Sequence, residues 1–169
     1  MPDLLIQLTK RNDGGSVLRC LRADGSVTWQ KNEGRQAMFF PIHDLSHYAV
    51  ETELGFRSGF YGLIASGWDI KDTEGKGPRD ALPSEAVTVE KIVGSFDVER
   101  AGGEEWNADD FNDQAAAYAA THNLPAPPVW SDEDLGRIRR RIRDLVGRWS
   151  ALEAGATLEL TYDRADVGP

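Results

Sequence analysis

Hydrophobic and polar residues alternate near the N-terminus, which is the pattern of β-strands with one buried face. Leu4, Ile6 and Leu8 occupy every second position, so an extended segment here has one apolar side. Runs rich in aspartate, asparagine and glycine follow at residues 12–15 and 24–25, and such runs favour tight turns. The first thirty residues therefore predict a three-stranded antiparallel meander.

Further along, the period of the apolar residues changes to that of helices. We expect a helix over residues 42–54, with Gly55 as its C-terminal cap, and a short helix over 58–66. Residues 69–83 are polar and contain glycine, which predicts a surface loop, either mobile or folded over a site. Three later helices are expected over residues 84–100, 108–122 and 132–154, the last two capped by Asn107 and Ser131.

The C-terminal segment returns to the alternating pattern. Polar residues separate Leu158, Leu160 and Tyr162, so a final strand should pair with the N-terminal sheet. A chain of 169 residues suits one domain with a single core. We therefore predict a single α+β domain over residues 1–169, in which a mainly antiparallel sheet of about four strands packs against about five helices.

The composition narrows the classes of function open to such a domain. A formal net charge of −9 would repel a phosphate backbone, which argues against nucleic acid as a partner. No apolar run reaches the roughly 18 residues of a membrane span, and Asp3 stands where a signal peptide needs positive charge. Cys20 is the single cysteine, so it cannot form an internal disulfide, and we expect it in the core. These features predict a cytoplasmic protein.

The first predicted helix carries a cluster of side chains that could perform chemistry. His43 and His47 are one helical turn apart, so they share a face and could hold a divalent metal such as zinc. With Asp44 they form a His-Asp-x-x-His string, which is similar to the His-Glu-x-x-His signature of zinc peptidases. The glutamate of that signature is a general base. Asp44 is one methylene shorter, which weakens the transfer of that role to it.

Glu51 continues the same stripe one turn beyond His47. It lies about 12 Å along the helix axis from His43, so the two cannot easily share one ion. We expect Glu51 to hold the second ring nitrogen of His47 and so orient that ligand, as carboxylates commonly do. A third ligand must come from elsewhere in the fold, and His122 and an acidic residue are both open choices.

The sequence supports a second interpretation of this stripe. Leu45 and Ala49 on one side and Val50 and Leu54 on the other predict a helix buried on both sides. Buried polar groups are normally paired, so the histidines and acids could form a structural hydrogen-bond network. The protein would then serve in interaction or assembly. If it is instead a metal-dependent hydrolase, its substrate is a small molecule or a peptide that the sequence does not identify.

These residues also resemble a motif of uncharacterised bacterial proteins. The shared pattern is Pro-x-His-Asp-Leu-x-His with a glutamate four residues on, followed by Gly-Phe-aromatic-Gly. In this chain the pattern corresponds to Pro41, His43, Asp44, Leu45, His47, Glu51, Gly59, Phe60, Tyr61 and Gly62. The resemblance covers about a quarter of the chain and implies no particular activity, so it only adds weight to the stripe.

The last predicted helix is rich in arginine on one face and apolar on the other. Its apolar residues recur from Leu135 to Leu152, and burial in the core of the same chain explains them most simply. A coiled-coil seam is less favoured, because Arg139 and Arg141 flank the stripe with no clear acidic counterpart except Asp144, so two such helices would bring arginines together. We therefore expect a monomer or a weak homodimer, with any dimer contact at the sheet edge or around Phe60 and Tyr61.

Overall fold

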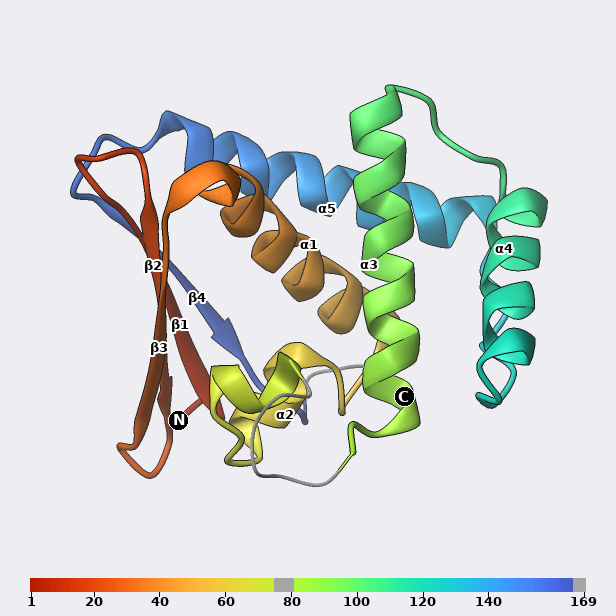
Figure 1. Ribbon diagram of the computed structural model, residues 1–169, viewed down its shortest axis with the longest axis horizontal. Helices are drawn as coiled ribbons and strands as arrows, with labels where there is room; N and C mark the ends of the chain where they lie inside the picture. Colours follow the sequence, from red (N-terminus) through yellow and green to blue (C-terminus); the bar gives the residue numbers. More distant parts are fainter. Residues whose placement is uncertain (75–80, 166–169) are drawn as a thin grey trace.

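Four strands form one antiparallel sheet, and the helices pack against one of its faces (Figure 1). The computed structural model describes residues 1–74 and 81–165. The order across the sheet is β3-β2-β1-β4, so the C-terminal strand pairs with the first strand, as predicted. The strands are β1 (Leu4–Lys10), β2 (Ser16–Arg22), β3 (Val27–Asn32) and β4 (Thr157–Tyr162).

Alternation along the strands separates the two faces of the sheet. Leu4, Ile6 and Leu8 are buried, and Ile6 pairs with Cys20 on β2 and with Leu160 on β4. These side chains therefore line up across three strands on the face that the helices cover. Cys20 is fully buried, and burial raises the pKa of its thiol to about 12, which confirms it as a core residue.

The helices follow the predicted order, with several ends displaced. They are α1 (Phe39–Leu54), α2 (Phe60–Ala65), α3 (Ser84–Gly102), α4 (Ala108–Thr121) and α5 (Asp132–Ala151). Two short 3-10 helices complete the fold. The first, η1 (Gly34–Gln36), connects β3 to α1, and the second, η2 (Ile70–Glu74), follows α2. The architecture confirms the predicted α+β class.

The first helix begins earlier than predicted, at Phe39 rather than at residue 42. Pro41 lies in its first turn, where the missing backbone N–H would have no helical partner, so the proline does not mark the boundary. The expected C-terminal cap is confirmed, because Gly55 adopts a left-handed conformation with φ of 75°.

The last helix ends three residues before the predicted end, because Leu152 already has an extended backbone. Lys10 at the end of β1 accounts for this end. Its Nζ donates to the carbonyls of Trp149 and Leu152, each at 2.9 Å, which satisfies free acceptors of the helix. After the helix, Gly155 adopts a positive φ, leads the chain into β4 and donates its N–H to the carbonyl of Lys10.

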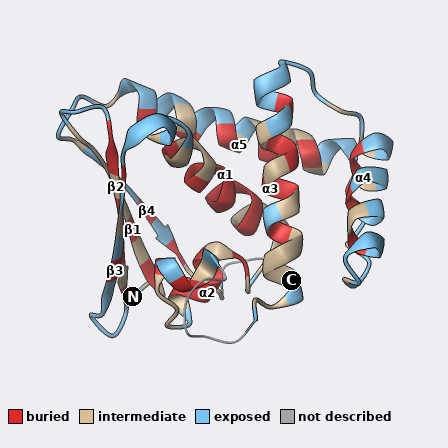
Figure 2. Ribbon diagram, viewed as in Figure 1, coloured by how far each residue is buried: buried red, intermediate tan, exposed pale blue. Residues whose placement is uncertain are grey.

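Figure 2 shows a long buried stretch in α1, which lies between the sheet and α3. All residues from 44 to 51 are buried, including Asp44, His47 and Glu51. The prediction of a helix buried on both sides is confirmed. Polar side chains on this helix therefore face the interior of the fold, where unpaired groups are costly.

The apolar stripe of α5 is buried within the same chain, as Leu135, Ile138, Ile142, Leu145 and Trp149 show. One of the arginines that flank the stripe has an acidic partner on α3.

Arg139 makes a two-pronged ion pair with Glu99 of α3, with contacts of 2.6 and 3.0 Å. The pair joins α5 to α3, and only the tertiary structure brings the two residues together.

Two further expectations concern the surface. Tyr61, suggested as an exposed interface residue, is 1% exposed and belongs to the core, so that suggestion is wrong. Within the predicted loop 69–83 the structure forms η2, and residues 75–80 lie outside the described residues. Across residues 1–74 and 81–165, no helix combines the length and the apolar character needed to cross a membrane.

Candidate metal centre

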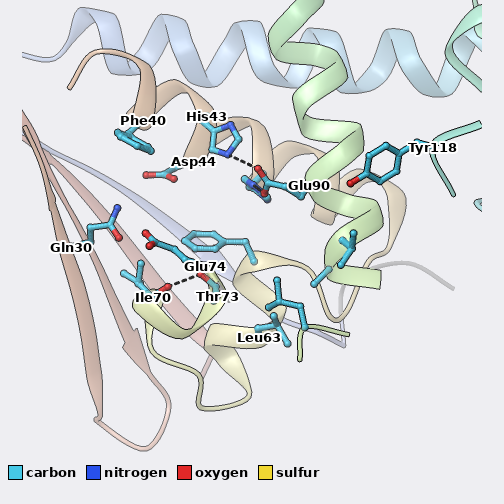
Figure 3. A pocket seen from close by; sticks show the side chains of 15 residues that line it. Gln30, Phe40, His43, Asp44, Leu63, Ile70, Thr73, Glu74, Glu90 and Tyr118 are labelled. Carbon is cyan, nitrogen blue, oxygen red and sulfur yellow. Dashed lines mark hydrogen bonds and ion pairs between the residues drawn. The ribbon is translucent and has the colours of Figure 1, made fainter. Parts of the chain in front are cut away.

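Two neighbouring helices bring three potential metal ligands together. His43 and His47 belong to α1, and Figure 3 shows Glu90 of α3 facing His43. His43 Nε2 lies 3.3 Å from Glu90 Oε1, and His47 Nε2 lies 2.9 Å from Glu90 Oε2. One ligand atom from each residue lies within 4.8 Å of the other two. We call these three residues the His-His-Glu cluster.

The other ring nitrogen of each histidine is held by a separate carboxylate. His43 Nδ1 lies 2.7 Å from Asp97 Oδ2, and His47 Nδ1 lies 3.2 Å from Glu51 Oε2. A carboxylate on Nδ1 favours the tautomer that leaves Nε2 as a lone-pair donor, which is the form a metal requires. The structure thus places Glu51 where the sequence predicted it, and adds Asp97 in the same position for the other histidine.

Glu51 is completely buried, and its position is fixed by α2. The backbone N–H groups of Tyr61 and Gly62 donate to its Oε1 at 2.9 and 3.3 Å. Gly59 makes this approach possible, because a Cβ atom there would lie 2.5 Å from the Glu51 carboxyl carbon. The glycines that follow the histidine stripe in the sequence therefore position the residue that orients His47.

Burial and charge act against each other on the two histidines. Burial alone would lower the pKa of His43, but hydrogen bonds with Asp97 and Glu90 outweigh it and raise that pKa to about 9. Burial opposes protonation of His47 too, yet contacts with Glu51 and Glu90 raise its pKa. The same contacts hold the pKa of Glu90 well below its usual range. In the metal-free protein the cluster therefore retains protons that a cation would displace.

Asp44, the candidate base, is also buried but is not part of the cluster. Its Oδ2 atom has no hydrogen-bond partner in the described structure. Burial raises the pKa of Asp44 to about 6, although the nearby charges of His43 and His47 oppose this rise. The side chain lines a cavity together with the cluster, so its carboxyl group faces the space where a ligand would lie.

The cavity has a volume of about 390 Å³ and reaches the solvent beside Glu90, whose side chain is 61% exposed. Its walls are formed largely by apolar and aromatic side chains from α1, α2, α3 and α4 and from η2, among them Phe40, Phe60 and Tyr118. The cluster therefore lies at the wall of an accessible, mostly apolar space, which is the setting of many small-molecule sites.

The sequence predicted the two histidine ligands of this cluster but left the third ligand open. His122, one candidate for the third ligand, caps α4 and stacks on Tyr118 at 3.8 Å, and it is not part of the cluster. The acidic alternative is Glu90. A signal for Glu90 and Asp97 was present, because they lie seven residues apart on one side of α3. The chain has many other acidic residues, and Glu90 and Asp97 come close to the histidines only because α3 packs against α1.

The chain was compared with profiles of known protein families, with curated proteins and with solved structures, and none matches. The geometry of the site must therefore carry the functional argument by itself.

Proposed function

We propose that this protein binds a divalent metal ion, such as zinc, through His43, His47 and Glu90, and that the bound metal serves hydrolysis of a small substrate. The convergence of both Nε2 atoms and one carboxylate on a single point carries this proposal. The donor set fits, because imidazole nitrogens with a carboxylate oxygen suit zinc and related transition metals.

The alternative is a structural network in which the histidines simply pair with acids. One observation favours a metal. The Glu90 side chain is 61% exposed, and ion pairs with exposed partners stabilise a fold only weakly. The approach of both histidine Nε2 atoms to Glu90 is therefore better explained by the binding of a metal ion.

Three protein ligands suit a catalytic metal rather than a structural one, because they leave coordination positions for water or substrate. When bound, such a metal would supply Lewis-acid activation. The chain's own residues would divide the remaining work. Glu51 and Asp97 would orient the two imidazoles through their Nδ1 atoms.

The metal content of protein purified without a histidine tag and without chelator tests the proposal. We expect close to one zinc or similar ion per chain in the wild type, and its loss in the double variant His43→Ala, His47→Ala. The matched control is His122→Ala, which removes the exposed third histidine. An equal metal content in all three proteins, or no metal in any of them after incubation with zinc, would contradict metal binding.

Glu90→Gln separates the metal from the structural network. As a ligand change it should lower zinc affinity by more than the roughly 100-fold typical of residues that only orient ligands, with little change in melting temperature. A structural network predicts the reverse: a lower melting temperature and no metal to lose. Glu153→Gln, an exposed carboxylate after α5, is the control and should change neither quantity.

A further inference from the structure

The cavity beside the His-His-Glu cluster has a charge pattern that the metal does not explain. Of the described residues that line it, Asp44, Glu74 and Glu90 are acidic and none is lysine or arginine. Glu90 belongs to the cluster, which leaves Asp44 and Glu74 as carboxylates outside it. In Figure 3 both project into the space between Gln30 and Phe40. These two residues therefore place carboxyl groups at the wall of the cavity.

Asp44 is the most informative of these acids. Its side chain is 6% exposed, and its Oδ2 atom is buried without a hydrogen-bond partner in the described structure. Leaving a buried carboxylate oxygen unpaired costs stability, so an unpaired one facing a cavity indicates a ligand group that completes it. A carboxylate accepts hydrogen bonds from any N–H or O–H donor, and a cationic donor also complements its charge.

The remaining wall of the cavity suits the body of such a ligand. Phe40, Phe60 and Tyr118 contribute aromatic rings, and Leu63, Ile70 and Val87 contribute aliphatic surface. Aromatic faces attract cations and also cover apolar groups. A volume of about 390 Å³ holds a molecule of only modest size.

We propose that the cavity binds an organic cation, a primary amine on an apolar or aromatic body, whose ammonium group pairs with Asp44. As an assignment of substrate class this inference rests on the proposed function, whereas the binding itself requires no metal. An anionic ligand would meet the unpaired carboxylate of Asp44 at short range.

Titration calorimetry with three probes of similar shape tests the inference. The probes are phenethylamine, the neutral 2-phenylethanol and the anionic 3-phenylpropionate, used at about pH 8, where the amine is cationic. We expect the amine to bind at least tenfold more tightly than the other two. Asp44→Asn should weaken amine binding at least tenfold, and the control Asp113→Asn, at an exposed position on α4, should leave it unchanged.

Each titration is carried out on metal-free protein and again on zinc-loaded protein. Amine binding in the metal-free arm excludes direct coordination of the amine nitrogen to zinc. If zinc binds and the amine does not, only the substrate inference fails. If the amine binds and zinc does not, the metal proposal fails and the cation site stands. Equal binding of the alcohol, tighter binding of the acid, or an unchanged affinity in Asp44→Asn would each overturn the inference.

Discussion

Glu51 Oε2 lies 3.2 Å from Nδ1 of His47, one turn earlier on α1, and so leaves Nε2 of that ring directed at Glu90. The opposite oxygen of Glu51 is held by the backbone of α2. This pair links the position of α2 to the orientation of a proposed metal ligand. It also explains how a fully buried carboxylate is accommodated, since it accepts hydrogen bonds on both oxygens.

Glu51→Gln should impair the site more than its similar shape suggests. If the amide oxygen keeps the backbone hydrogen bonds, the NH₂ group faces His47 Nδ1 and favours the tautomer whose Nε2 carries the proton. We expect zinc affinity to fall by roughly 10- to 100-fold in a competition titration with a chelator. Glu153→Gln serves as the control here too. Unchanged zinc affinity together with an unchanged melting temperature would show that Glu51 has no role in orienting His47.

Metal affinity should rise with pH. In the metal-free protein the pKa of His43 is raised to about 9 and that of His47 is also raised, so below pH 9 both rings bind protons. A metal requires neutral imidazoles, and each displaced proton makes the apparent affinity climb about tenfold per pH unit. Zinc titrations at about pH 6, 7 and 8 should therefore show a steep increase with proton release. A flat profile would indicate that these rings do not bind the metal.

Gly59→Ala should destabilise the protein, because the new Cβ would lie 2.5 Å from the Glu51 carboxyl carbon. Glu51 is fixed by hydrogen bonds and cannot move away freely, so we expect a loss of about 1 to 3 kcal/mol in unfolding free energy. Gly94→Ala in the middle of α3 is the matched control. An added Cβ meets nothing within 4 Å there, and the change should stabilise by about 0.5 to 1 kcal/mol. Chemical denaturation measures both.

Asp44→Asn should stabilise the metal-free protein while it removes amine binding. The folded-state pKa of Asp44 is raised from 3.8 to about 6, so its contribution to stability is lost as the pH rises through this interval. Above about pH 6 the buried charge costs on the order of 2 to 3 kcal/mol. Asparagine lacks this charge. We expect a melting temperature several degrees above wild type at pH 8, and little difference near pH 4. A variant less stable than wild type at pH 8 would mean that the carboxylate has a structural partner.

The sequence alone predicted most of the secondary structure, because local patterns carry the information. Alternation at Leu4, Ile6 and Leu8 defines β1, and Ser131 with Asp134 forms the capping box that begins α5. Helix ends that depend on contacts with residues distant in the sequence were predicted poorly. Lys10 at the end of β1 caps the end of α5, and no pattern near residue 152 contains that contact.

The candidate site divides in the same way. One helical turn of spacing places His43, His47 and Glu51 on one stripe, so the sequence determined these residues and the role expected of Glu51. The tertiary structure decided the rest. Glu90 and Asp97 reach the histidines only because α3 packs against α1, and the unpaired Asp44 is visible only once the cavity is formed. The spacing of residues along the sequence predicts that they share one face of a helix. Which helix faces contact one another depends on the packing of the whole chain.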